Sequence, residues 1–284
     1  MTIKVHRAEN SFRENIGKSW HRAGSFLLGI LFPRRCPFCH EIVPTADDLI
    51  CPDCRRLVKR YYLIQEPVCK RCGKAISSMR SEYCMDCAEH PRSFDGGISV
   101  FRYGRRNLKP IPGKLPGYEK HSMGESVLRF KYHNCREYAD YYIEEMLSEY
   151  GTVLRRFRPD VIIPVPVHPS RYRKRGYNQA EILARKLGER LQIEVCSTLL
   201  VRVKKTRPQK ELNTTERMRN LQKAFTIEGT MPKGYRRILL IDDIYTTGST
   251  MEICTRRLKE AGAEKVFCIS ICSGQVPDAS EWKL

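Results

Sequence analysis

Eight of the thirteen cysteines form a regular pattern in the first third of the chain. They make four pairs with two residues between the partners, eleven residues separate the pairs within each half, and the second half repeats the first at an offset of 33 residues. Two intervening residues allow a tight turn that points both sulfurs at one ion, and two such turns complete the tetrahedral thiolate set of a structural zinc site. The predicted zinc ligands are Cys36, Cys39, Cys51, Cys54, Cys69, Cys72, Cys84 and Cys87.

The cysteine count also favours a reducing compartment. An odd total of thirteen does not suit a disulfide framework, whereas thiolates kept reduced can hold a soft metal, and zinc fits better than iron–sulfur or redox use. The longest apolar run, residues 26–32, is far shorter than the ~20 residues of a membrane span, so we expect a cytoplasmic protein. The spacing leaves open whether the ligands pair in chain order or interleave across the repeat. It also leaves open whether the module docks a partner or replaces a small core.

A second chemical signal lies between an apolar run and a helical pattern near the C-terminus. Two acids, Asp242 and Asp243, precede a segment rich in hydroxyl side chains. The start of a helix offers unpaired N–H groups to a phosphate, but adjacent acids would repel a bare phosphate. The pattern therefore favours a phosphate attached to a sugar whose hydroxyls donate to the acids. Neither a Walker-type loop nor a G-x-G-x-x-G dinucleotide motif occurs. The predicted phosphate ligands are Thr246, Thr247, Gly248, Ser249 and Thr250.

Alternating apolar runs and helical patterns surround this segment. A length of 284 residues indicates about two domains. Strands are expected over residues 96–103, 161–167, 238–241 and 266–271, and helices over 137–150, 179–191 and 249–261. Continuous apolar strands that alternate with helices are typical of a doubly wound parallel sheet with its sites at the strand C-termini. The predicted units are an N-terminal segment (1–35), a zinc-binding module (36–92) and an α/β domain (93–284).

Residues 238–248 resemble the phosphoribosyl diphosphate (PRPP) binding motif of type I phosphoribosyltransferases. Further segments, at 159–168, 175–180 and 206–220, are similar to the ComF family of competence proteins, which also carry an N-terminal cysteine cluster. The resemblance covers roughly residues 26 to 102 and 123 to 273. It implies a type I phosphoribosyltransferase-like doubly wound parallel sheet, preceded by a small zinc-ribbon-like domain. The Pro- and Gly-rich stretch at 104–122 is longer than the family leads us to expect.

The resemblance also implies roles for individual residues. Asp242 and Asp243 would hold the ribose hydroxyls, residues 246–250 the 5′-phosphate, and residues 164–168, with Val165 and Pro166, the diphosphate. Transfer displaces diphosphate through an oxocarbenium-like state, so Mg²⁺ and cationic side chains are needed where negative charge grows. The cationic candidates are Arg171, Arg175, Arg207 and Lys210. Glu211 and His168 are candidate proton acceptors, and the acceptor substrate cannot be read from the residues.

The charge distribution points to a polyanionic partner. The chain has 51 Lys and Arg against 32 Asp and Glu, a net charge of +19. Residues 171–223 hold fifteen Lys or Arg and five Glu, so +10 of this excess is concentrated there. Such a surface attracts the backbone of single-stranded DNA, and aromatic rings between cations stack on its bases. The candidate DNA contacts are Tyr172, Arg173, Lys174, Tyr177, Lys204 and Lys205.

Three functions fit these features. One is the handling of single-stranded DNA during natural competence and DNA uptake, with a competence helicase or channel component as a candidate partner. The others are PRPP-dependent phosphoribosyl transfer in nucleotide metabolism and PRPP sensing by a regulatory or partner-binding module. The intact acids and phosphate segment favour PRPP or a related ligand, whereas the basic charge and the zinc module favour nucleic acid. We therefore expect the first function, with transfer chemistry as the alternative.

Overall fold

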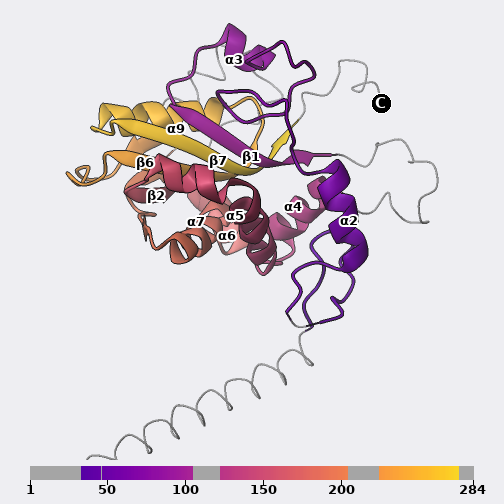
Figure 1. Ribbon diagram of the computed structural model, residues 1–284. Helices are drawn as coiled ribbons and strands as arrows, with labels where there is room; N and C mark the ends of the chain where they lie inside the picture. The colour runs from indigo at the N-terminus through magenta and orange to yellow at the C-terminus, as the bar shows by residue number, and fades with distance from the viewer. Residues whose placement is uncertain (1–32, 46, 105–121, 204–223, 275–284) are drawn as a thin grey trace, which may run out of the picture.

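A five-stranded parallel sheet forms the centre of the computed structural model, which describes residues 33–45, 47–104, 122–203 and 224–274 (Figure 1). The strand order is β1–β7–β6–β2–β3, and every neighbouring pair is parallel. The strands are β1 (Gly96–Tyr103), β2 (Val161–Pro164), β3 (Glu194–Val195), β6 (Arg237–Tyr245) and β7 (Lys265–Gly274). The sequence-based prediction of a parallel α/β sheet is confirmed.

Side chains along the central strands alternate between two apolar layers. In β6, Leu239 and Ile241 belong to one buried cluster, whereas Ile238 and Leu240 belong to the other. Successive side chains of a strand point to opposite faces, so a strand buried on both faces needs an uninterrupted apolar run. The run at 238–241 meets this need, which places β6 in the middle of the sheet.

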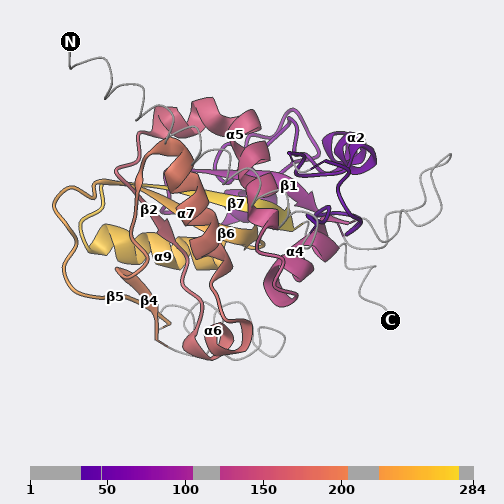
Figure 2. The ribbon, with the colours of Figure 1, turned by 90° about the horizontal axis from the view of Figure 1, so that it is seen from below.

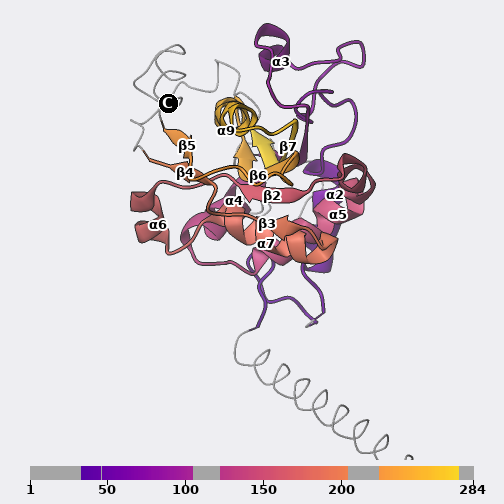
Figure 3. The same cartoon turned by 90° about the vertical axis from the view of Figure 1, so that its left-hand side faces the viewer.

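Helices cover both faces (Figure 3). One face carries α4 (Met123–Tyr132), α5 (Tyr138–Phe157) and α7 (Gln179–Leu191), and the other carries α9 (Ser249–Glu260). The side chain of Ser122 caps α4 and that of Asn178 caps α7, so each accepts a backbone N–H that the first turn leaves unpaired. Among the described residues, no helix is long and apolar enough to cross a lipid bilayer.

Smaller elements surround this core. The short helix α6 (Pro169–Arg175) follows β2, and β4 (Leu200–Arg202) pairs antiparallel with β5 (Phe225–Ile227). In Figures 2 and 3, α6 and the β4–β5 pair lie on the same side of the sheet. Helices α2 (Pro52–Tyr61) and α3 (Met85–Glu89) each begin within a cysteine pair of the N-terminal module.

The expected elements are present, with differences at their ends. Helix α7 and strand β1 begin and end at the predicted residues, whereas α5 continues to Phe157. The sequence suggested that Asp242 and Asp243 lie in the turn after the strand. Strand β6 instead continues to Tyr245, so both acids lie in the strand. Residues 169–175 form a helix where a basic turn was expected, because Pro169 and the capping side chain of His168 favour a helical start. The stretch at 104–122 falls almost entirely outside the described residues.

Candidate functional site

The eight predicted zinc ligands come together in two sets of four. Within each set the sulfur atoms all lie within 4.8 Å of one another. The first cluster is Cys36, Cys39, Cys51 and Cys54, and the second cluster is Cys69, Cys72, Cys84 and Cys87. The ligands therefore pair in chain order and do not interleave across the repeat.

The spacing of the sulfurs fits zinc. The Sγ atoms of Cys39 and Cys51 are 3.7 Å apart, as are those of Cys72 and Cys84. A tetrahedral zinc ion with bonds of ~2.3 Å separates its sulfur ligands by ~3.8 Å. Four sulfurs per ion leave no open coordination position, so both sites are structural.

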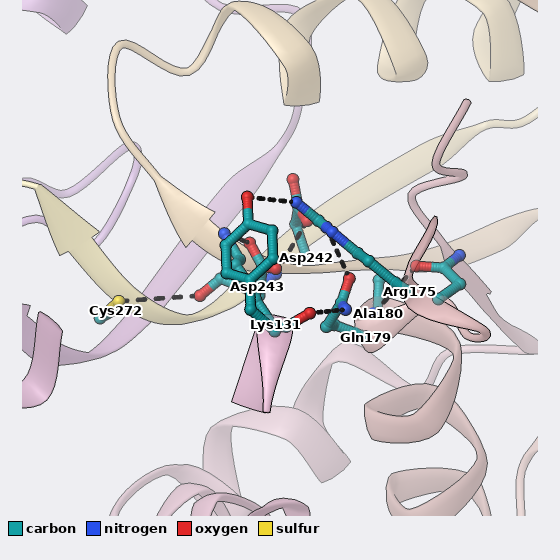
Figure 4. A network of polar contacts seen from close by, with 9 residues as sticks. Lys131, Arg175, Gln179, Ala180, Asp242, Asp243 and Cys272 are labelled. Carbon is teal, nitrogen blue, oxygen red and sulfur yellow. Dashed lines mark hydrogen bonds and ion pairs between the residues drawn. The ribbon is translucent and has the colours of Figure 1, made fainter. Parts of the chain in front are cut away.

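Two adjacent acids at the end of β6 meet a lysine from a distant part of the chain (Figure 4). The Nζ of Lys131, in the last turn of α4, lies 2.9 Å from Oδ1 of Asp243. The side chains of Lys131 and Asp243 are 16% and 12% exposed. Asp242 is partly exposed at the rim, and its Oδ1 accepts a hydrogen bond of 2.8 Å from the backbone N–H of Asp243. Lys131 therefore offsets the charge of one of the two carboxylates, and the acid pair lies at the end of strand β6.

The electrostatics of this pair follow from its burial. Burial and the charge of Asp243 raise the pKa of Asp242 to about 7, against the opposing effect of Lys131. Burial disfavours the charged form of Lys131, but the attraction of Asp243 and Asp242 outweighs it and raises the pKa of that lysine. The raised pKa of Asp242 thus lies close to neutral pH, beside the ion pair of Lys131 and Asp243. Lys131 was not among the predicted site residues, because α4 was not expected and a lysine at a helix end is a common surface feature.

The turn after β6 is open and depends on a glycine. We call residues 246–250 the phosphate turn. Gly248 has a φ of +76°, and a Cβ there would lie 2.2 Å from the hydroxyl of Tyr245. Thr246 and Thr247 are exposed, and Ser249 and Thr250 are partly exposed. The turn thus presents its hydroxyls, and the start of α9, to solvent directly beyond the acid pair.

Residues after β2 adjoin the same edge of the sheet. The N–H of Val165 donates to the carbonyl oxygen of Ile241 at 2.9 Å, and Asn178 Nδ2 donates to the carbonyl oxygen of Val165 at 3.1 Å. Val165 and Pro166 therefore lie beside the strand end that carries Asp242. The Nδ1 of His168 accepts a hydrogen bond from the N–H of Ser170, so this atom caps α6.

Cationic side chains gather around the acids. Arg175 donates to the hydroxyl of Tyr132 at 2.7 Å and to Gln179 at 3.0 Å, and its guanidinium lies 4.5 Å from the centre of the Tyr132 ring. Figure 4 shows that this network includes Lys131 and the two aspartates. Arg202 of β4 is a further cation near the site that the sequence did not indicate. Burial and the charge of Arg171 lower the pKa of Arg202, while Asp242 opposes this effect.

The candidate DNA contacts divide into three groups. Tyr172, Arg173 and Lys174 are exposed on α6. The interpretation of Tyr177 as a stacking platform is wrong, since its ring is 5% exposed, its hydroxyl donates to the carbonyl oxygen of Phe130, and Arg136 lies 4.4 Å from its ring centre. The remaining candidates lie outside the described residues, and with them the predicted transfer residues: Lys204, Lys205, Arg207, Lys210 and Glu211.

Two family models match the chain, one in its N-terminal part and one in its C-terminal part. Residues 27–88 match the double zinc ribbon domain, and residues 153–280 match the phosphoribosyl transferase domain. The first match contains all eight clustered cysteines, and the second contains β6, the acid pair and the phosphate turn.

Several curated proteins are similar to this chain. It is 29% identical over 246 residues to competence protein F of Haemophilus influenzae, a match that covers 83% of this chain and 95% of that protein. It is 28% identical over 230 residues to competence protein ComFC of Streptococcus pneumoniae, with 79% and 88% covered. DNA utilization protein YhgH of Escherichia coli strain K12 is 36% identical over 113 residues, which cover 39% of this chain and 49% of that protein.

A solved structure of purine phosphoribosyltransferase from Pyrococcus horikoshii aligns with a TM-score of 0.30 and 19% identity, over 47% of this chain and 83% of that one. The order of the two family matches agrees with the two cysteine clusters and the parallel sheet described above. In this chain, the segment that matches a double zinc ribbon precedes the segment that matches a phosphoribosyl transferase domain. The chain is a homologue of competence protein F and of ComFC.

Proposed function

We propose that this protein binds PRPP, or a related phosphoribosyl ligand, at the end of β6 and handles single-stranded DNA during DNA uptake. One observation carries the first part: a carboxylate pair, half-neutralised by Lys131, directly precedes an open turn at the start of α9. A bare anion would be repelled by the acids, whereas a sugar phosphate satisfies both halves of the site.

Each half has its own chemistry in this proposal. The carboxylates of Asp242 and Asp243 accept hydrogen bonds from the ribose hydroxyls, and the ion pair with Lys131 holds Asp243 in place. The N–H groups and hydroxyls of the phosphate turn bind the 5′-phosphate, with the positive end of the α9 dipole behind them. Gly248 allows the phosphate to approach the backbone.

The diphosphate end of the ligand needs positive charge. Val165 and Pro166 adjoin the acid pair, and Arg171 and Arg175 lie on the helix that follows them. We propose that this segment binds the diphosphate, together with Mg²⁺, which neutralises its oxygens. Arg202 is a further candidate cation for this end of the site, because the charges of both Arg171 and Asp242 affect its pKa.

Calorimetry with PRPP in Mg²⁺ tests the assignment. Wild-type protein is expected to bind, and the double variant Asp242→Asn/Asp243→Asn is expected to lose binding, since neutral amides do not replace two charged acceptors. Circular dichroism and urea unfolding check that the variant is folded, because Lys131 would lose its partner. Unchanged affinity in a folded double variant would remove the acids from the site.

The DNA part of the proposal depends on α6 and on the relatives. Tyr172, Arg173 and Lys174 expose an aromatic ring between cations next to the proposed diphosphate segment, and Tyr172 is 47% exposed. A base can stack on such a ring while the cations contact the phosphates of the strand. The similar proteins are named for competence and for DNA utilization, which favours DNA over another polyanion. A competence helicase or channel component is the protein partner that this role would require.

Fluorescence anisotropy with a labelled single strand tests this part. Binding is expected to weaken steeply with salt, with a slope of about −0.7 per neutralised phosphate, and Arg173→Ala/Lys174→Ala is expected to reduce that slope. The matched control is Arg155→Ala/Arg156→Ala, which removes two exposed arginines from the last turn of α5, at the opposite end of the strands. A flat salt response, or an equal effect of both double variants, would overturn the DNA assignment.

Transfer chemistry is the second candidate function, favoured by the match of residues 153–280 to the phosphoribosyl transferase domain. Release of diphosphate from PRPP on addition of a nucleobase would support it. Binding of PRPP without release in the presence of any common base would instead favour a ligand that regulates the DNA function.

A further inference from the structure

The two cysteine clusters lie on opposite faces of the sheet. The first cluster belongs to the apolar layer of α4, α5 and α7, whereas the second belongs to the layer that contains Tyr245 and Met251, next to the phosphate turn. The second cluster also touches the sheet directly. Gly73, just after Cys72, has a φ of +71°, and a Cβ there would lie 2.7 Å from the carbonyl oxygen of Gly97 in β1. The second cluster thus packs against the sheet on the face that carries the phosphate turn, whereas the first cluster lies on the other face.

Arg92 joins the second cluster to the phosphate turn. Its Nη2 donates to the carbonyl oxygen of Thr247 at 2.9 Å and to that of Asp86 at 3.3 Å. Asp86 lies between the ligands Cys84 and Cys87, and its carboxylate accepts a bond of 2.7 Å from Lys74, two residues after Cys72. One guanidinium therefore spans from the turn between two metal ligands to the backbone of the phosphate turn.

Ser93 fastens the start of α9. Its N–H and its hydroxyl donate to the two carboxylate oxygens of Glu252 at 2.7 and 2.6 Å. Glu252 is 1% exposed and lies in the first turn of α9, where its own N–H donates to the carbonyl oxygen of Gly248. The residue next to Arg92 thus holds the helix end from which the proposed phosphate ligands project.

Tyr245 forms the third connection. Its side chain is 3% exposed, its hydroxyl lies beneath Gly248, and its ring packs edge-on against Phe94 with centres 6.5 Å apart. Tyr245 belongs to the same buried cluster as Cys72 and Cys87, and the Nζ of Lys74, two residues after Cys72, lies 6.0 Å from the centre of its ring. The floor of the phosphate turn therefore rests on the second cluster and on the segment that leaves it.

We propose that metal binding at the second cluster holds the phosphate turn in its binding shape through Arg92, Ser93 and Tyr245. These three are positioning residues: they contact the turn and the start of α9 from behind and do not contact the ligand. Small cysteine modules fold only when their metal is bound, so loss of the ion would release residues 84–94 and with them all three connections. The affinity for a phosphoribosyl ligand then depends on the occupancy of this one cluster. The inference rests on the proposed function only for that last step, because the shape of the turn can be measured without ligand.

Amide hydrogen exchange on the full chain tests the connection. Cys84→Ser/Cys87→Ser removes half of the second cluster, and Cys51→Ser/Cys54→Ser removes the corresponding half of the first. Metal analysis should find that each variant retains the ion of the other cluster. The second-cluster variant is expected to exchange the amides of residues 246–250 about tenfold faster than wild type, as the loss of one or two net hydrogen bonds implies, and the first-cluster variant to exchange them at the wild-type rate. Equal exchange in the two variants would overturn the proposal.

A milder pair of variants keeps the test valid if the second-cluster variant unfolds. Arg92→Ala leaves all eight cysteines in place, and its control Arg35→Ala removes one arginine that donates to a carbonyl oxygen, that of His40, within the first cluster. Exchange at residues 246–250 is expected to rise in Arg92→Ala alone, with the zinc content of both variants at the wild-type value. No rise in Arg92→Ala would overturn the proposal.

Calorimetry with PRPP and Mg²⁺ separates the two proposals. Weaker binding in Arg92→Ala, with the exchange pattern above, supports both. If wild-type protein does not bind PRPP but the exchange pattern holds, the proposed ligand is wrong and the connection between cluster and turn stands. If wild-type protein binds and Arg92→Ala binds equally well, the metal cluster does not govern the site.

Discussion

The ammonium of Lys131 and the carboxylate of Asp243 form an ion pair of 2.9 Å beneath the end of β6. The two residues are 112 positions apart in the chain. Removal of one partner leaves a buried charge without compensation, which costs far more than the loss of a surface pair. This ion pair is what allows two adjacent carboxylates to lie at a site proposed to bind an anionic ligand.

Lys131→Met is expected to destabilise the protein by about 3 kcal/mol, because Asp243 would lose its counter-ion. The control is Lys186→Met, whose partner is Asp140; these side chains are 34% and 33% exposed. That variant should cost less than about 1 kcal/mol, because solvent screens the pair. Urea unfolding at neutral pH measures both free energies of unfolding, and similar losses in the two variants would contradict the buried role of Lys131.

The pKa of Asp242, near 7, predicts how ligand binding depends on pH. Ribose hydroxyls donate to the ionised carboxylate, so affinity for PRPP should rise with pH, by up to about tenfold per unit below pH 7, and level off above it. Calorimetry in buffers of different ionisation enthalpy should detect proton release on binding near pH 7. In Asp242→Asn this dependence should vanish, and a pH-independent affinity in wild-type protein would exclude Asp242 as the acceptor.

The raised pKa of Asp242 also affects the stability of the folded protein, which should fall with rising pH although the affinity for the ligand rises. Its pKa is raised in the folded protein, from an ordinary value of 3.8, so between these values the folded form holds a proton that the unfolded chain has released. The contribution of Asp242 to the free energy of unfolding therefore falls as pH rises through this window. Urea unfolding at the two ends of this window should show that wild-type protein loses more of its free energy of unfolding with rising pH than Asp242→Asn does. A contribution that grows with pH would contradict the raised pKa.

Gly248→Ala should abolish phosphate binding. The new Cβ would meet the hydroxyl of Tyr245 at 2.2 Å, in a residue whose φ is +76°. Gly229→Ala is a matched control, since Gly229 has the same φ of +76° and nothing lies within 4 Å of the position of its Cβ. Both variants should lose about 1 kcal/mol from the left-handed backbone, and only Gly248→Ala should lose more and fail to bind PRPP in calorimetry. Equal behaviour of the two would show that the close approach of Tyr245 is unimportant.

Metal analysis should find two zinc ions per chain, one for each set of four sulfurs. Because each ion would hold four cysteines of its module together, strong chelators should lower the melting temperature and expose the cysteines to thiol reagents. Mass spectrometry under native conditions gives the stoichiometry, and a single ion per chain would contradict the assignment of both sets of four cysteines as zinc sites.

Local patterns in the sequence were sufficient for much of the fold. The continuous apolar run at 238–241 indicates a strand buried on both faces, and the periodic pattern at 179–191 indicates a helix, because both signals depend on residues close together in the chain. The spacing of the cysteines likewise indicates structural zinc. The phosphate turn is recognisable from local sequence for the same reason, since Asp242, Asp243 and Gly248 lie within seven consecutive residues.

The tertiary structure decided what depends on residues far apart in the chain. Lys131 reaches the acid pair from α4, and Arg92 reaches Thr247 across 155 positions, which no local pattern can indicate. The same is true of Tyr177, whose basic neighbours suggested an open ring but whose side chain packs into the interior. The sequence by itself determined most of the central strands, the helices α5, α7 and α9 and the chemistry of each motif, because these follow from neighbouring residues, whereas α4 and α6 were not expected. Packing alone decided which cations reach the acids and which zinc cluster lies behind the turn.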